Sequence, residues 1–317
     1  MIELAEIEAA RARIADVAAR TPLVRLYAAE VPDGTEVYLK LEALQPIGSF
    51  KIRGATNAVR LASESERAGG LITASAGNMA QGVAWAAREL GLTATIAVPE
   101  HAPQAKLDAI ERLGGKVVKL PYDDWWQAIV TSRVEGVDGL FVHPVQDEGV
   151  MAGNGTIGLE ILEDLPDPDA VVIPYGGGGL ATGIASAIRS QKPDTRIYTA
   201  EPATGAAIAA AFEAGEPTDV AYSPSFVDGA GSRRVLDTMW PRVRPLIDGA
   251  FAVPIDDAAA AVRTLASRAR VIAEGAGALA TAAALAGRAG TGKIVCIVSG
   301  GNIDLAKLAD ILRGDAP

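Results

Sequence analysis

Residues 170–190 read AVVIPYGGGGLATGIASAIRS, in which a strand-like run, four glycines and a helix-like run follow one another. The run 170–175 has the apolar and β-branched character of a buried strand, and 180–190 has the apolar spacing of a helix. Pro174 and the four glycines at 176–179 would break a membrane-spanning helix here. A strand that passes through a small-residue turn into a helix is half of a βαβ unit, so this stretch predicts a parallel sheet buried on both faces.

The same alternation continues through the rest of the chain, after an expected amphipathic helix over residues 1–20. Other strands are expected at 22–26, 36–42, 71–75, 93–99, 116–121, 140–144, 196–202, 251–255 and from 293. Helices are expected at 79–90, 102–114, 123–135, 150–165, 204–215, 256–274 and 302–312. The predicted class is α/β, with two interleaved lobes, each a mainly parallel sheet flanked by helices.

Composition excludes several classes of protein. A chain of 317 residues with 49% hydrophobic and 21% charged residues is globular, with room for two lobes. The net charge of −10 argues against binding to nucleic acid or to an anionic membrane. The charged N-terminus is not a signal peptide, and Cys296 is the single cysteine, so we expect a cytoplasmic protein without disulfides.

Parallel sheets bind ligands beyond the carboxyl ends of their strands. Three junctions at such ends are rich in small residues: SAGN at 75–78, GGGG at 176–179 and SGGN at 299–302. The glycine run can direct several backbone N–H groups and a helix dipole at one anion, for which a phosphate is the natural candidate. Two alternatives remain open. Gly176, Gly178, Ala181 and Glu201 also match a dinucleotide-binding fingerprint, and the glycines could serve helix packing alone.

Lys51 lies in PIGSFKIRGATNAV, residues 46–59. Ser49 is the expected N-cap of a helix that starts at Phe50, which places the Lys51 amine in the first helical turn. The helix dipole and an apolar neighbour both favour the neutral, nucleophilic amine. The alternative is a solvated surface lysine.

Five segments, taken together, resemble one family. SFKIRGA at 49–55, SAGN at 75–78, AGNGTIGLEIL at 152–162, the four glycines and VSGGNIDL at 298–305 are similar, in the same order, to the serine/threonine dehydratase and serine racemase group of fold type II pyridoxal-phosphate enzymes. This group lies in the tryptophan synthase beta-like superfamily. The resemblance implies a large cofactor-binding domain of residues 1–42 and 146–317 and a small mobile domain of residues 43–145.

The resemblance also implies roles for individual residues. Lys51 would be the catalytic residue and would bind pyridoxal 5′-phosphate. Further cofactor contacts would come from Phe50, Asn78, Gly176, Gly177, Gly178, Gly179, Leu180, Glu274 and Ser299. Substrate contacts would come from Ser75, Ala76, Gly77, Asn78 and Ser232.

The implied reaction is the elimination of water from a hydroxyamino acid, giving a 2-oxo acid and ammonia, in a homodimeric ammonia-lyase. The substrate would be threonine or serine, with 3-hydroxyaspartate, phenylserine or a hydroxyectoine-breakdown intermediate as alternatives. A serine racemase, a nicotinamide-dependent oxidoreductase and a catalytically silent binding protein are the other hypotheses.

Some positions depart from the family pattern. Ala76 stands where the racemases carry a serine base, which predicts elimination over racemisation, and Met79 stands where dehydratases commonly have histidine. Glu201 matches a divalent-cation ligand, but Ala207 replaces an aspartate ligand, which weakens that site. Trp125 and Trp126 replace an arginine that binds a distal acidic group in some relatives; either they line the pocket or they only pack. His143 and His101 receive no role.

Overall fold

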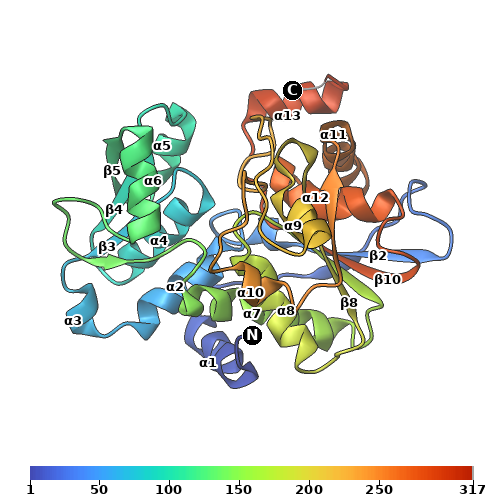
Figure 1. Cartoon of the computed structure of the whole chain (residues 1–317), viewed down its shortest axis with the longest axis horizontal. Helices are drawn as coiled ribbons and strands as arrows, with labels where there is room; N and C mark the ends of the chain where they lie inside the picture. The colour runs from blue at the N-terminus through green and yellow to red at the C-terminus, as the bar shows by residue number, and fades with distance from the viewer. Residues whose placement is uncertain (316–317) are drawn as a thin grey trace.

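The computed structural model describes residues 1–315 and consists of two lobes, each built on its own sheet (Figure 1). The sheet of the small lobe is entirely parallel, in the order β5 (Gly115–Leu120), β4 (Ala94–Pro99), β3 (Leu71–Ala74), β6 (Leu140–Phe141). The sheet of the large lobe has the order β1 (Leu23–Arg25), β2 (Thr35–Lys40), β10 (Gly292–Ile297), β7 (Ala170–Pro174), β8 (Arg196–Pro202), β9 (Gly249–Val253). Only β1 is antiparallel to its neighbour.

Helices connect the strands, as the sequence predicts. They are α1 (Leu4–Ile14), α2 (Lys51–Leu61), α3 (Glu64–Arg67), α4 (Asn78–Glu89), α5 (Gln104–Arg112), α6 (Tyr122–Thr131), α7 (Glu148–Asp164), α8 (Gly179–Arg189), α9 (Ala207–Ala214), α10 (Trp240–Val243), α11 (Ile255–Thr264), α12 (Gly275–Leu285) and α13 (Leu305–Arg313). Short 3₁₀ turns occupy η1 (Glu42–Leu44) and η2 (Ala203–Gly205), and η3 (Leu265–Ala269) is a π-helical turn. Within residues 1–315, none of these helices has the length and apolar character needed to span a membrane.

The two lobes are interleaved along the chain. The chain completes β1 and β2 in the large lobe, enters the small lobe near residue 50 and leaves it after β6. Helix α7 then packs against α8, α2 and α1, and the remaining strands complete the large sheet. The predicted fold class is therefore confirmed.

The short helices α3 and α10 and the longer helix α12 are absent from the sequence prediction, and another helix is shorter than predicted. Helix α12 has the sequence GAGALATAAAL, and all its residues except the last are buried. A helix buried on every side has no polar face, so it lacks the periodic signal of an amphipathic helix. The helix predicted over 256–274 ends earlier, because η3 closes on Arg270 with a left-handed backbone (φ 62°).

A buried cluster of charges fixes α2 between the lobes. Arg53, 1% exposed, donates to both oxygens of Glu42 at 2.8 Å and to Glu160 at 2.7 and 2.9 Å. The Lys40 ammonium lies 2.5 Å from the second oxygen of Glu160. The cluster thus holds two cations and two carboxylates in balance, and it holds α2 two residues after Lys51.

Candidate active site

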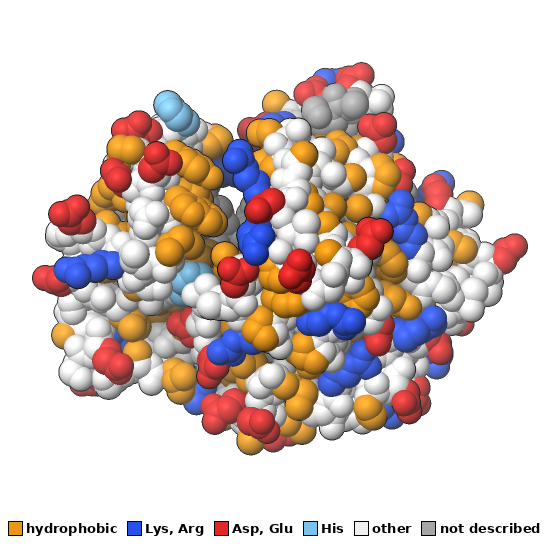
Figure 2. Space-filling model, viewed as in Figure 1, with side chains coloured by type: hydrophobic (Ala, Val, Ile, Leu, Met, Phe, Trp, Pro, Cys, Tyr) orange, Lys and Arg blue, Asp and Glu red, His pale blue; other side chains and the backbone are white. Residues whose placement is uncertain are grey.

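The main cavity lies between the lobes, has a volume of about 340 Å³ and opens at the hollow visible in the space-filling view (Figure 2). Its walls come from the carboxyl ends of β3, β7 and β10, where parallel sheets bind ligands. The predicted cofactor and substrate residues lining it are Phe50, Lys51, Ser75, Ala76, Gly77, Asn78, Gly176, Gly177, Gly178, Gly179, Leu180, Glu274 and Ser299. Ser232 is not part of this lining.

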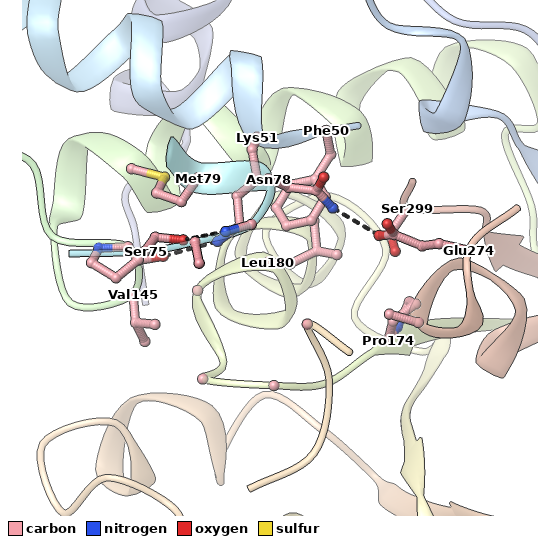
Figure 3. A pocket seen from close by; sticks show the side chains of 18 of the residues that line it. Phe50, Lys51, Ser75, Asn78, Met79, Val145, Pro174, Leu180, Glu274 and Ser299 are labelled. Atoms are coloured by element: carbon pink, nitrogen blue, oxygen red, sulfur yellow. Dashed lines mark hydrogen bonds between the residues drawn. The ribbon is translucent and has the colours of Figure 1, made fainter. Parts of the chain in front are cut away.

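Lys51 is the first residue of α2, and its side chain points into the cavity (Figure 3). Its amine donates a hydrogen bond to the Pro144 carbonyl at 3.1 Å and lies 5.2 Å from the Phe50 ring centre. Removal from water lowers the pKa of this amine to about 8, against an opposing effect of the Glu274 charge. The neutral amine, which a nucleophile or proton acceptor requires, is therefore more populated near pH 7 than in an ordinary lysine.

The start of α2 corrects one prediction. The helix begins at Lys51 with Phe50 as its N-cap residue, and Ser49 instead forms a β-bridge with Gly300. The Ser49 hydroxyl is buried and has no hydrogen-bond partner among residues 1–315. The backbone bond from Phe50 to the Ser299 carbonyl, at 3.0 Å, fixes the strand-like entry to the helix. Pairing with the SGGN segment therefore replaces the expected side-chain cap.

The glycine run forms the turn between β7 and α8. Gly178 has φ +98°, a conformation that favours glycine. A Cβ on Gly177 would lie 2.3 Å from Cγ2 of Val145, so this residue must stay small for the loop 142–147 to approach. The first N–H groups of α8 have no partner within the helix and lie at the cavity wall. The turn can thus bind an anion, and its glycines also serve packing.

Asn78 and Glu274 connect the two lobes across the cavity (Figure 3). The Asn78 amide donates to Glu274 at 2.8 Å and its oxygen accepts from Asn302 at 2.8 Å. Burial, with a smaller contribution from Asp228, raises the pKa of Glu274 to about 8. A Cβ on Gly300 would lie 2.5 Å from the Glu274 carboxylate, which explains a glycine at this place in SGGN.

Ser299 is available to a ligand because another residue caps the following helix. Asp304 is the N-cap of α13, and its carboxylate accepts from the N–H groups of Ala306 and Lys307 at 2.8 and 3.1 Å. Ser299 therefore does not serve as the cap of this helix. Ser299, 3% exposed, lies in the cavity lining.

The cavity lining also includes Met79 and Trp125, together with residues to which the sequence analysis assigns no role: Pro99, Lys106, Pro144, Val145, Pro174, Gly229 and Ala276. Trp125 lines the cavity, whereas Trp126 is 42% exposed, which resolves the ambiguity of the tandem tryptophans. Lys106 of α5 forms an ion pair with Asp228 of the large lobe at the cavity edge. These residues come from many segments, and no sequence motif joins them.

Glu201 lies outside the cavity lining. Its carboxylate accepts the Ala209 N–H at 2.8 Å, near the start of α9. Burial raises its pKa to about 8, against hydrogen bonds from α9 that lower it. Residues 1–315 contain no cluster of three His, Cys, Asp or Glu side chains placed to hold a metal ion. The single carboxylate serves the helix start and does not fit a divalent-cation site.

Ser232 also takes part in local structure. Its hydroxyl donates to the Arg234 carbonyl at 3.1 Å. This position does not bring it to the cavity, so the predicted substrate contact stays a prediction.

The chain is similar to known proteins over nearly its whole length. The family model described as "Pyridoxal-phosphate dependent enzyme" matches residues 14–300. An L-threonine ammonia-lyase of Thermotoga maritima is 40% identical over 316 residues, 99% of this chain and 79% of that protein. Maize serine racemase superposes with a TM-score of 0.90 and 32% identity, covering 98% of this chain and 97% of that one. Threonine deaminase isoform 2 of Solanum lycopersicum has a TM-score of 0.87 and 36% identity, covering 98% and 91%.

Proposed function

Because the chain belongs to the family of pyridoxal-phosphate-dependent enzymes, we propose that its substrate is L-threonine, with L-serine as a second substrate. The enzyme is an ammonia-lyase of the threonine dehydratase type, and it eliminates the β-hydroxyl as water to yield a 2-oxo acid and ammonia. The observation that carries this proposal is the likeness to L-threonine ammonia-lyase over 99% of the chain. The family match makes the dinucleotide-binding hypothesis wrong.

The cofactor is pyridoxal 5′-phosphate, and the cavity residues fit it. We propose that the Lys51 amine binds its aldehyde carbon and that Phe50 contacts its ring. The N–H groups of Gly176–Gly179 and Leu180 would hold the phosphate, since a helix N-terminus favours an anion. Asn78 and Ser299 would contact the polar ring atoms, close to Glu274. Two observations support this assignment: the first N–H groups of α8 have no partner within the helix, and the pKa of the Lys51 amine is lowered.

The cofactor, when bound, withdraws electrons from the substrate α-carbon and makes its proton acidic. The Nζ atom of Lys51 is the base for this proton, because its lowered pKa leaves part of the amine neutral near pH 7. Ser75–Asn78 at the start of α4 would orient the substrate carboxylate, in a loop that the Ser75 hydroxyl fixes by accepting the Gly77 N–H at 3.2 Å.

The apolar side of the cavity supports threonine over substrates with a second carboxylate. Met79 and Trp125 offer carbon surface to the methyl group of threonine. Lys106, the nearby cation of the small lobe, is already paired with Asp228. A distal carboxylate would have to displace that partner, which disfavours 3-hydroxyaspartate.

A product assay tests the proposed function. We expect L-threonine to yield 2-oxobutanoate and ammonia in equal amounts, with little D-allo-threonine, the product of inversion at the α-carbon. Inversion needs a second acid or base on the face opposite Lys51, and the methyl group of Ala76 cannot move a proton. Chiral chromatography and a coupled oxo-acid assay measure the two outcomes. Absence of 2-oxo acid from every hydroxyamino acid tried would refute the proposal.

The Ala76→Ser variant extends this test to the choice of reaction. We expect inversion of L-serine to rise at least about tenfold, since a positioned acid–base group typically contributes 10²–10⁴-fold. Ala276→Ser is the matched control, because it adds a hydroxyl to the same cavity from the large lobe. An equal rise in both variants, or none in Ala76→Ser, would contradict the role given to position 76.

We also propose that the chain forms a homodimer. Leu44 and Ile272 are 54% and 50% exposed, and their segments meet at Gly301, where a Cβ would contact Ala43 and the Ile272 carbonyl. Leu305 beyond them is 76% exposed. We expect sedimentation equilibrium at micromolar concentration to give twice the chain mass, and Ile272→Glu to shift it to monomer. A wild type that sediments as monomer would disprove the proposal.

Two further assignments follow from the same reasoning. We propose that residues 43–145 move as a small domain against residues 1–42 and 146–317. The separate four-stranded and six-stranded sheets support this division. We also propose a cytoplasmic location. Cys296 of strand β10 is the single cysteine and is buried, so the chain needs no oxidising compartment for a disulfide within it.

A further inference from the structure

The loop 142–147 carries the chain from the small lobe back to the large lobe, from the end of β6 to the start of α7. Val142 still pairs with the small sheet, since its N–H donates to the Ile72 carbonyl at 2.8 Å. Asp147 already belongs to the large lobe and caps α7 through the Val150 N–H at 3.1 Å. The turn between them is therefore a crossing point of the two lobes.

His143 holds this turn with one ring atom. Its Nδ1 accepts hydrogen bonds from the backbone N–H groups of Val145 at 3.0 Å and Gln146 at 2.9 Å. The side chain is only 6% exposed. Since Nδ1 accepts both bonds, it carries no proton, and the neutral ring carries its proton on Nε2.

The environment of the ring favours this neutral form. Burial, with a smaller contribution from the Lys51 charge, lowers the pKa of His143 to about 4, against a backbone hydrogen bond with Ile129 that raises it. Above this pKa the ring is neutral, so Nδ1 can accept the two N–H bonds.

The turn that His143 holds contacts both the Lys51 amine and the glycine turn of the cavity. The Pro144 carbonyl accepts the hydrogen bond of the Lys51 amine at 3.1 Å. The Val145 side chain packs against Gly177, and its carbonyl oxygen lies 3.0 Å from the position of a Cβ on Gly179. One imidazole therefore fixes both the acceptor of the Lys51 amine and the support of the glycine turn.

We propose that His143 is a positioning residue, which through its Nδ1 holds Pro144 against Lys51 and Val145 against the glycine turn. This inference rests on the proposed function, because it concerns the same cavity. It predicts that losing the Nδ1 acceptor weakens cofactor binding and slows turnover without preventing folding.

A matched pair of substitutions tests this role. In His143→Asn the amide oxygen takes the place of Nδ1 and can accept the same backbone N–H groups, as Asn does in local turns. In His143→Gln the amide lies at the place of Nε2 and cannot. His101→Asn is the control, because His101 is exposed and does not line the cavity.

The first readout is the dissociation constant of pyridoxal phosphate, titrated into the apoenzyme and followed by absorbance. We expect it to rise about tenfold or more in His143→Gln and His143→Ala, and to stay near the wild-type value in His143→Asn. The second readout is kcat of the saturated enzyme, which should fall in the same order with little change in KM. Melting curves of each apoenzyme report the folded fraction.

The ranking of the variants decides the outcome. If His143→Gln binds pyridoxal phosphate at least as tightly as His143→Asn and also has at least its kcat, the Nδ1 role is overturned. If the variants differ from wild type only in melting temperature, His143 is merely structural and the proposal fails. Should His143→Ala not fold, the Asn and Gln pair still gives the ranking. The dissociation constants need no substrate, so this test stands even if L-threonine proves not to be turned over.

Discussion

Lys51→Ala abolishes turnover of L-threonine, with an expected loss of about 10³-fold or more, since one residue supplies both the cofactor attachment and the base. The fold should survive. Lys51 lies at the first position of α2, and alanine is the best helix former. Burial lowers the pKa of the wild-type amine, so below its ordinary pKa the lysine costs stability that alanine does not. We therefore expect the melting temperature of the apo variant to equal or exceed that of the wild type.

The measurement combines turnover with chemical labelling. Borohydride reduction of the wild-type holoenzyme should attach the cofactor to the peptide that contains Lys51, and the variant should show no attachment. Lys116→Ala on β5 is the control, because Lys116 is exposed and outside the cavity. Retention of wild-type activity by Lys51→Ala, or a label on another lysine, would show that the chemistry lies elsewhere.

Much of the fold could be predicted because its signals are local. Apolar β-branched runs alternate with amphipathic helices, and each small-residue junction marks the end of a strand. Parallel pairing then brings the carboxyl ends of β3, β7 and β10 to one place, which is why SAGN, GGGG and SGGN meet around one cavity.

The parts that escaped prediction depend on contacts between distant segments. Helix α12 has no polar face, so only its burial by the rest of the large lobe explains it. Ser49 looks like an N-cap, but pairing with Gly300, some 250 residues later, overrides the local preference. The role of Lys106 depends on its ion pair with Asp228, and that of His143 depends on the hydrogen bond between Lys51 and the neighbouring Pro144 carbonyl. A short stretch of sequence cannot reveal such contacts, because the partners lie far apart along the chain.

Arg53 links the fold to the site, and its loss should have the largest effect on stability. Its guanidinium donates to Glu42, Glu160, the Thr156 hydroxyl at 3.0 Å and the Ala19 carbonyl at 3.0 Å. Burial alone would raise the pKa of Glu42, but the charge and hydrogen bonds of Arg53 outweigh it and leave the pKa lowered. Arg53→Met leaves two buried carboxylates with Lys40 as their only cation. Breaking a buried pair in this way costs about 3–5 kcal/mol.

The pH dependence separates this mechanism from simple loss of packing. In the wild type the lowered pKa of Glu42 contributes stability above its ordinary pKa of 4.5, and this contribution is lost as the pH falls. In Arg53→Met the carboxylates of Glu42 and Glu160 no longer have the arginine as partner, so burial raises their pKa values. The variant therefore loses stability as the pH rises through these raised pKa values. The difference in urea midpoint between wild type and Arg53→Met should therefore shrink from pH 8 to pH 5.5.

The control for this comparison lies on the same helix. Arg60 of α2 pairs with Asp16 at the surface, where water screens the charges, so Arg60→Met should change the urea midpoint far less and with little dependence on pH. A difference between wild type and Arg53→Met that stays constant from pH 8 to pH 5.5 would mean that lost packing, and not two uncompensated carboxylates, destabilises the variant.

Because α2 begins at Lys51, a displaced helix should also move the amine from the Pro144 carbonyl. We therefore expect the folded fraction of Arg53→Met to bind pyridoxal phosphate more weakly than Arg60→Met does.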